Sequence, residues 1–230
     1  MEDEAPESLR LDPAFADRFD RQKRLPCQLY LISPPAIDGA FADRLARAFD
    51  AGPVAAFQLR MKGVSDHEIA RLAEPIRRLC ADRDVSFIVN DSVGLAKRLG
   101  ADGVHLGQGD GDPREARAAL GPEAQIGVTC HDSRHLAMEA GEAGADYVAF
   151  GSFYLTITKE VHHRPEPSIL GWWTTLFELP CVAIGGITPD NALPLIEAGA
   201  DFLAVCGAIW SAGEGEEAAV RAFARVLGAG

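Results

Sequence analysis

The chain has 230 residues, of which 47% are hydrophobic and 24% charged, and its formal net charge is -12. These values are typical of a globular protein with one large core, and so acidic a chain would be repelled by nucleic acid or an anionic membrane surface. The acidic start M-E-D-E-A-P-E-S and the lack of any run of about 18 apolar residues predict a soluble, cytoplasmic protein.

From residue 26 onward, short apolar runs alternate with longer segments of helical period, which is typical of repeated βα units. Strands are predicted near 28–33, 54–60, 85–90, 102–106, 125–130, 146–151, 180–185 and 202–207. Helices are predicted near 39–51, 65–80, 92–99, 113–120, 133–143, 170–178, 189–198 and 215–227. Eight such units predict an α/β fold, a single (β/α)8 TIM barrel with its active site in the loops after the strands.

Three near-repeats, L-G-A-D-G-V, A-G-A-D-Y-V and A-G-A-D-F-L, each run from a predicted helix end into the next strand. This repetition favours a quasi-symmetric barrel over an open doubly wound sheet. We therefore expect one barrel domain over residues 26–230. Residues 1–25 are expected to be an N-terminal extension that either adds a helix or is disordered.

Cations follow the second predicted strand, in Q-L-R-M-K. Because side chains alternate along a strand, Gln58, Arg60 and Lys62 are expected on the same side, with both cations directed toward the barrel mouth. Together the two cations can neutralise an anion. The alternative is that both are ordinary solvated surface charges.

Two aspartates follow the third and fourth predicted strands: V-N-D ends in Asp91 and G-Q-G-D ends in Asp110. Neighbouring parallel strands end at the same edge of a sheet, so the two carboxylates are placed to share one hard cation. Mg²⁺ is commonly held by one or two carboxylates plus substrate phosphates, so the pair predicts phosphate chemistry. Helix capping is the alternative for Asp91, whereas Asp112, directly before Pro113, is a better cap than Asp110.

The last three strand ends carry groups suited to phosphate. The segment F-G-S-F-Y-L-T-I-T-K supplies Thr156, Thr158 and Lys159 as donors for phosphate oxygens. Gly186 in A-I-G-G-I and Gly207 in V-C-G-A-I would let backbone N–H groups approach a phosphate monoester. Phosphate sites after strands seven and eight recur in this fold.

As an ordered set, Q-L-R-M-K, V-N-D, G-V-H-L-G-Q-G-D, G-V-T-C-H, F-G-S-F-Y-L-T-I-T-K, V-A-I-G-G-I and V-C-G-A-I resemble the thiamine phosphate synthase family. The resemblance covers roughly residues 26–212. It implies a (β/α)8 transferase of thiamine biosynthesis that joins a pyrimidine-methyl diphosphate to a thiazole phosphate and releases pyrophosphate with Mg²⁺ as cofactor. It implies small phosphorylated substrates as partners and leaves a homo-oligomer open.

The resemblance also implies roles for individual residues. The Mg²⁺ ion would be held against the diphosphate by Asp91 and Asp110. The diphosphate oxygens would be bound by the four groups expected to carry catalysis, Arg60, Lys62, Asn90 and Lys159. The pyrimidine and diphosphate would be approached by Gln58 and Thr129. The thiazole phosphate would lie near Thr156 and Thr158 and would be received by the backbone of Gly186, Cys206 and Gly207.

The chain departs from the family pattern at four positions. The family usually has prolines where this chain has Ser152 and Leu155, often an arginine at Ser92, and a serine at Gly207. Loss of that serine hydroxyl would remove one phosphate contact, worth about 1 kcal/mol or somewhat more. Two alternatives therefore stay open: a thiazole tautomerase on the same barrel, which needs no diphosphate clamp, and a non-catalytic paralogue that binds a phosphorylated ligand.

Overall fold

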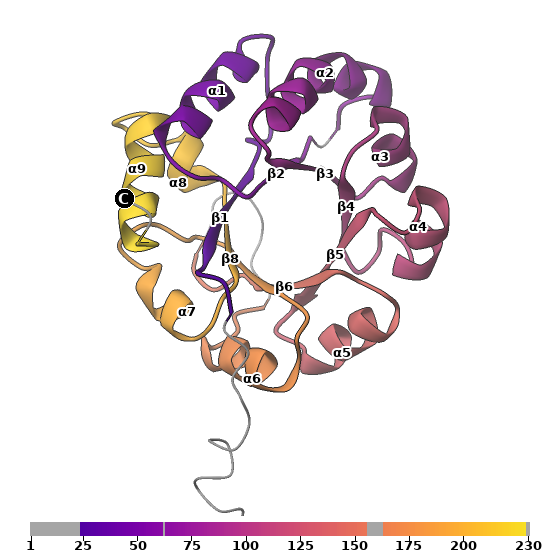
Figure 1. Cartoon of the computed structure of the whole chain (residues 1–230), viewed down its shortest axis with the longest axis vertical. Helices are drawn as coiled ribbons and strands as arrows, with labels where there is room; N and C mark the ends of the chain where they lie inside the picture. Colours follow the sequence, from indigo (N-terminus) through magenta and orange to yellow (C-terminus); the bar gives the residue numbers. More distant parts are fainter. Residues whose placement is uncertain (1–23, 62, 156–162, 229–230) are drawn as a thin grey trace, which may run out of the picture.

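The computed structural model describes residues 24–61, 63–155 and 163–228, and these form a closed barrel of parallel strands in sequence order, ringed by helices (Figure 1). The strands are β1 (Gln28–Ile32), β2 (Ala56–Leu59), β3 (Ser86–Asn90), β4 (Gly103–Leu106), β5 (Gln125–His131), β6 (Tyr147–Gly151), β7 (Cys181–Ile184) and β8 (Phe202–Val205). The helices are α1 (Phe41–Ala51), α2 (Asp66–Asp82), α3 (Val93–Leu99), α4 (Pro113–Leu120), α5 (Arg134–Glu142), α6 (Ser168–Leu176), α7 (Leu193–Glu197), α8 (Gly207–Trp210) and α9 (Glu216–Val226).

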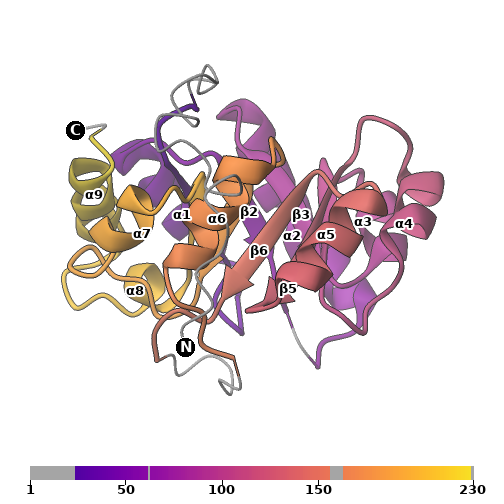
Figure 2. The ribbon, with the colours of Figure 1, turned by 90° about the horizontal axis from the view of Figure 1, so that it is seen from below.

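All eight predicted strands are confirmed, and the barrel closes where β1 pairs with β8. Seen from the side, α5 lies outside β5 and β6, as it does in the view down the barrel (Figure 2). Residues 1–23 of the expected extension (1–25), together with Lys62, Thr156, Thr158 and Lys159, lie outside the described residues.

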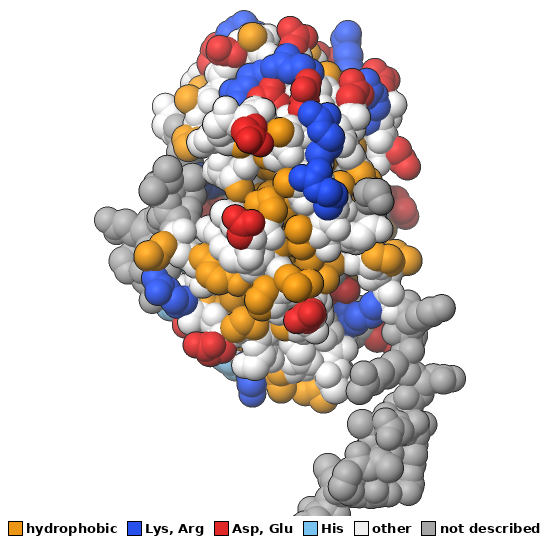
Figure 3. Space-filling view, turned by 90° about the vertical axis from the view of Figure 1, so that its left-hand side faces the viewer, with side chains coloured by type: hydrophobic (Ala, Val, Ile, Leu, Met, Phe, Trp, Pro, Cys, Tyr) orange, Lys and Arg blue, Asp and Glu red, His pale blue; other side chains and the backbone are white. Residues whose placement is uncertain are grey.

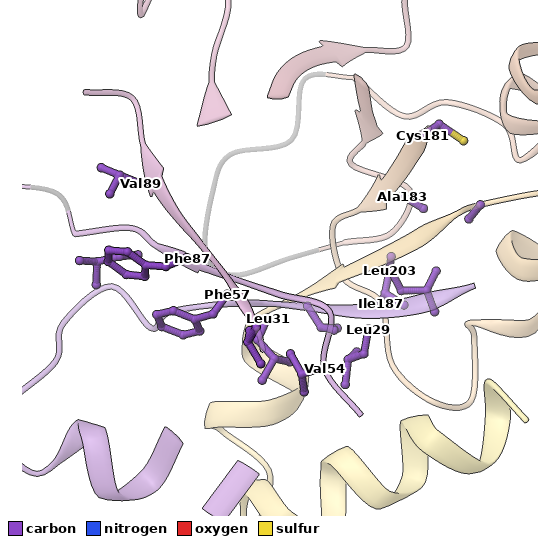
Figure 4. Close-up of a cluster of buried hydrophobic side chains, with 14 of the residues drawn as sticks. Leu29, Leu31, Val54, Phe57, Phe87, Val89, Cys181, Ala183, Ile187 and Leu203 are labelled. Atoms are coloured by element: carbon purple, nitrogen blue, oxygen red, sulfur yellow. The ribbon is translucent and has the colours of Figure 1, made fainter. Parts of the chain in front are cut away.

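The strands are short and buried on both faces, which explains their nearly continuous apolar sequences. In β1, Leu29 and Leu31 belong to the large cluster between the barrel and its helices. Tyr30 and Ile32 alternate with them and belong to a second cluster inside the barrel. Figure 4 shows Leu29, Leu31 and Phe57 of the outer cluster beside residues from the neighbouring strands. Each inward position can therefore be identified from the alternation.

The aspartates of the three near-repeats make the same hydrogen bonds at the amino-terminal ends of the strands. Carboxylates of Asp102, Asp146 and Asp201 accept backbone N–H bonds from the preceding odd-numbered strand, at 2.7, 2.6 and 2.8 Å. The backbone N–H of each aspartate donates to the carbonyl of that same strand residue. The repeated sequence thus produces a repeated strand-to-strand link, at the end opposite the strand-end loops.

Capping residues mark the ends of several helices. Ser65 caps α2 by accepting a bond from Glu68 N–H at 3.3 Å, and Gly100 ends α3 in a left-handed conformation. The helix expected near 189–198 is present but shorter, because α7 begins only at Leu193 and ends at Glu197. Thr188 N–H donates instead to the side chain of Asn191 at 2.8 Å, a local bond that competes with helix formation.

Helices α1 and α9 pack against each other on one side of the ring. On that face, hydrophobic side chains gather in the middle, and charged side chains of both signs are most crowded toward one end (Figure 3). Glu216 of α9 is buried and pairs with Arg47 and Arg44 of α1 at 2.5 and 3.4 Å. None of the helices in the described ranges is long and apolar enough to cross a membrane.

Candidate functional site

Arg60 directly follows β2 and its backbone is fastened to the end of β1. Its N–H donates to Ser33 Oγ at 2.8 Å, and the same hydroxyl donates back to the Arg60 carbonyl at 3.1 Å. Ser33 is buried, and its own carbonyl accepts a bond from the Cys206 thiol at 3.3 Å. Ser33 therefore joins the ends of β1, β2 and β8, a role that the sequence analysis missed.

The pKa of the Cys206 thiol shows which groups act electrostatically on the end of β8. Burial raises the pKa of Cys206 to about 11, and the Arg60 guanidinium opposes part of that rise. The thiol is therefore neutral at physiological pH, and a cation acts on the strand end where a phosphate is expected. Arg60, which follows β2, therefore also acts electrostatically on the end of β8.

The end of β3 is a tight turn around Asp91. Asp91 has a positive φ of 63°, and the Ser92 N–H donates across it to the Asn90 carbonyl at 2.8 Å. Asp91 N–H donates to the His105 carbonyl of β4 at 2.8 Å. The cap of α3 is Ser92, whose hydroxyl accepts from Leu95 N–H at 3.2 Å. Helix capping therefore does not account for Asp91, and the departure from the family at Ser92 has a structural role.

Asp110 folds back over the end of β4. Its Oδ2 accepts the Gly107 N–H at 3.0 Å, while Asp110 N–H donates to the Gly107 carbonyl at 3.2 Å. A Cβ at Gly107 would lie 2.6 Å from that Oδ2, so only glycine leaves room for the carboxylate. Asp112 caps α4, accepting from Arg114 N–H at 2.7 Å, as the sequence predicts. Asp110 is exposed and is not a helix cap.

The strand-end carboxylates have the chemistry of a site for a hard cation. Asp91 and Asp110 follow adjacent, paired strands and offer only oxygen ligands. In the described part of the chain, no group of three or more His, Cys, Asp or Glu side chains could hold a metal ion. Two carboxylates suit Mg²⁺ completed by water and phosphate oxygens better than zinc, which needs three or four protein ligands.

The loop after β7 packs closely on the loop after β6. A Cβ at Gly186 would lie 2.3 Å from the Leu155 carbonyl, and Gly186 has a φ of 64° that favours glycine. Asn191 Nδ2 donates to the Gly186 carbonyl at 3.1 Å, and Tyr154 donates to the Asn191 carbonyl at 2.8 Å. Asn191 and Tyr154 thus fix the Gly186 backbone, and the sequence analysis identified neither.

Helix α8 follows β8 immediately. It begins at Gly207, after Cys206, and the first N–H groups of a helix have no acceptor within it. A Cβ at Gly207 would meet nothing within 4 Å. The hydroxyl of the serine that the family usually has at this position would therefore lie in open space in this chain.

A chain of polar side chains crosses the barrel interior, where branched apolar residues are usual. Gln58 Nε2 donates to Tyr30 at 3.0 Å, and the Tyr30 and Tyr147 hydroxyls lie 3.0 Å apart. His105 bonds Tyr147 through Nδ1 at 3.0 Å and Thr129 Oγ1 through Nε2 at 2.8 Å. Gln58 and Thr129, both predicted to contact the pyrimidine, are therefore the two ends of one connected chain.

Tyr30 and Tyr147 were missed because tyrosine in a strand is most simply interpreted as packing. The signal was present in the alternation, since both occupy inward positions in line with the polar Gln58 and His105. A β-bulge between Thr129 and His131 keeps Thr129 paired with Ala149 while the strand end shifts. Interior polarity at several strands, taken together, would have identified the chain.

Comparisons with known proteins identify the family of the chain. A family model described as thiamine monophosphate synthase matches residues 29–209. A thiamine-phosphate synthase of Erythrobacter litoralis is 63% identical over 212 residues, covering 90% of this chain and 99% of that protein. One of Rhodospirillum centenum is 58% identical over 202 residues, covering 87% and 98%. The solved thiamine phosphate pyrophosphorylase of Pyrococcus furiosus superposes with a TM-score of 0.76 at 29% identity, covering 87% and 95%.

Proposed function

The chain belongs to the thiamine monophosphate synthase family, and we propose on that premise that it is a thiamine-phosphate synthase working at the carboxyl ends of its barrel strands. It is a transferase that joins a pyrimidine-methyl diphosphate to a hydroxyethylthiazole phosphate and releases pyrophosphate. Both substrates are small and phosphorylated, in keeping with cations and backbone donors at the strand ends.

One observation carries the assignment of the diphosphate site. The two strand-end aspartates are not used as helix caps, because Ser92 and Asp112 perform that task one and two residues later. Asp91 and Asp110 follow the adjacent, paired strands β3 and β4, so both carboxylates lie at one edge of the barrel. We assign them to Mg²⁺, which when bound would neutralise charge on the diphosphate and make it a better leaving group.

Residues of the chain provide the remaining charge and orientation. The Ser33 hydroxyl fixes the Arg60 backbone, so the guanidinium begins from a rigid strand end beside the diphosphate. Asn90 and, from the sequence, Lys62 and Lys159 bind further diphosphate oxygens. The bond from the pyrimidine methylene carbon to the diphosphate oxygen breaks first, and the thiazole nitrogen lone pair then forms the new C–N bond. Positioning and electrostatics suffice for such a dissociative displacement, so no nucleophilic side chain is needed.

The thiazole phosphate is assigned to the ends of β7 and β8. Gly186 is fixed by Asn191, and Gly207 opens α8, so both contribute backbone donors beside Cys206. In the sequence, Thr156 and Thr158 follow β6 and would add hydroxyl donors. The neutral Cys206 thiol places no negative charge against the phosphate.

The test supplies the full chain with both phosphorylated substrates and Mg²⁺ and measures thiamine phosphate and pyrophosphate. Asp110→Ala is expected to lose Mg²⁺-dependent activity while keeping the fold. Asp112→Ala, in the same loop, is the matched control, since it should cost about 1 kcal/mol of stability as a lost cap but leave the Mg²⁺ dependence unchanged. Absence of product from the unmodified protein at high concentration would overturn the proposal.

A further inference from the structure

The hydrogen-bonded chain inside the barrel is built to stay in place. Gln58, Tyr30, Tyr147 and His105 are all at least 93% buried. A Cβ at Gly127 would lie 2.0 Å from Tyr147 Cζ, so the glycine on β5 makes the space that the Tyr147 ring fills. Among the described residues, no buried side-chain nitrogen or oxygen lacks a partner. A buried network of this kind is rigid and specific only when every member is satisfied.

Both tyrosines remain hydroxyl donors over the physiological range. Burial raises the pKa of Tyr30 to about 12 and raises the pKa of Tyr147 well above 10.0. Each phenol thus has one hydrogen to donate and lone pairs to accept with. Their two rings also meet edge to face, with centroids 6.2 Å apart, so their hydroxyls have little freedom to part.

The orientation of the Gln58 amide, together with donor counting, gives the chain a direction. The Gln58 amide donates to Tyr30, so Tyr30 can pass its hydrogen to Tyr147, and Tyr147 can pass its own to His105 Nδ1. A neutral histidine that accepts at Nδ1 carries its hydrogen on Nε2 and donates to Thr129 Oγ1. The Thr129 hydroxyl then directs its hydrogen away from the chain. Reversal would require every bond in the chain to reverse together.

This direction determines which hydrogen-bonding groups the two ends offer. Gln58 keeps its amide oxygen as an acceptor, and Thr129 keeps its hydroxyl hydrogen as a donor. A ring that carries an amino group and an unprotonated ring nitrogen presents the complementary pair, one donor and one acceptor. An analogue with an oxo group and a ring N–H presents the opposite pair.

We propose that Tyr30, Tyr147 and His105 are positioning residues that, as a directional hydrogen-bond relay, make Gln58 an acceptor and Thr129 a donor and so select an aminopyrimidine over its oxo analogue. The inference rests on the proposed function, because the pyrimidine substrate is assigned there. The relay touches no reacting atom. It acts through the two residues at its ends. Breaking it therefore changes the ratio of the affinities for the amino and oxo compounds, while the packing of the rings is kept.

The test measures dissociation constants of the aminopyrimidine-methyl diphosphate and its oxo analogue by calorimetry, without the thiazole substrate. The unmodified protein should prefer the amino compound by roughly 100-fold or more, because the wrong pattern leaves buried polar groups unpaired. Tyr147→Phe keeps the ring over Gly127 but breaks the relay, so this preference should fall at least tenfold, mainly through weaker binding of the amino compound. If Tyr147 is only structural, both compounds weaken equally and an unchanged ratio overturns the relay.

Tyr30→Phe breaks the same relay one bond earlier and keeps the test decisive if Tyr147→Phe does not fold. In a single relay, the double variant should lose no more than about twofold beyond either single variant, since the second break finds the chain already open. Multiplicative losses would show independent contacts and refute the relay. Synthesis of thiamine phosphate is assayed separately, so failure of the proposed function is distinguishable from failure of this inference.

Discussion

Gly107→Ala should displace the Asp110 carboxylate without removing it. The new Cβ would lie 2.6 Å from Asp110 Oδ2, and an ordinary contact begins at 3.4 Å, so this oxygen must retreat by about 0.8 Å. The atom in the way is the end of a side chain, and the φ of Gly107 is not in the left-handed region, so the backbone can stay in place. The 3.0 Å bond from Gly107 N–H to this oxygen would be lost or distorted.

The expected functional cost follows from the geometry that Mg²⁺ demands. Its ligands lie at about 2.0–2.1 Å with little angular freedom, so a displacement of this size removes or weakens one of its protein ligands. A misplacement near 1 Å can cost on the order of 100-fold in rate. We therefore expect Gly107→Ala to lower kcat/KM by roughly 10- to 100-fold and to raise the Mg²⁺ concentration needed for half-maximal activity.

The assay is a Mg²⁺ titration of thiamine phosphate formation, with thermal unfolding measured on the same samples. Gly109→Ala is the matched control, because a Cβ there meets nothing within 4 Å in the same loop. It should keep the activity and the Mg²⁺ response of the unmodified protein. If Gly107→Ala behaves like Gly109→Ala, the carboxylate position is not what the metal site requires, and the reasoning fails.

Asp201→Ala should destabilise the fold by about 2 kcal/mol with kcat unchanged, because it removes the bond to Cys181 N–H and the ion pair with Arg24. In chemical denaturation, Asp201→Asn should lose less stability, because asparagine keeps an acceptor. A loss of kcat in Asp201→Ala would contradict this structural role. Gly207→Ser should fit without loss of stability and lower the KM for thiazole phosphate roughly five- to tenfold through one added hydroxyl contact; an unchanged KM would place that phosphate elsewhere. The pKa of Tyr30 is raised to about 12 in the folded protein from 10.0, so the stability that its neutral form confers is complete below pH 10 and is lost as pH rises toward 12. That loss is about 1.4 kcal/mol of unfolding free energy per pH unit. When denaturation is measured between pH 10 and 12, the unfolding free energy of Tyr30→Phe should fall less steeply with pH than that of the unmodified protein. An identical slope for the two proteins would mean that Tyr30 ionises normally.

Much of the candidate site was predictable because local sequence determines it. A strand's alternation places Gln58 inward, and the change from strand to loop places Asp91 and Asp110 at one edge. Whether Asp91 or Ser92 caps α3 was not predictable, since aspartate and serine are both good caps. The structure decided it through a bond between the Ser92 hydroxyl and Leu95 N–H.

Other features depended on partners distant in sequence. The helix expected over 189–198 was shortened because Asn191 bonds the loop that includes Thr188 and Gly186, and Tyr154 holds Asn191 from another loop. The helix propensity of residues 189–198 contains no information about Tyr154, which lies in another loop. Ser33 likewise looks like an ordinary polar residue after a strand until Arg60 and Cys206 are brought beside it.

By itself, the sequence determined the eight-unit barrel, the order of its strand-end motifs and the family to which they belong. These follow from periodicity and short motifs, which are local properties. Only the tertiary structure decided that Gln58 and Thr129 are connected through Tyr30, Tyr147 and His105. Alternation shows which side chains point inward, but closure of the barrel determines which of them meet, because that depends on the register of every strand pair between them.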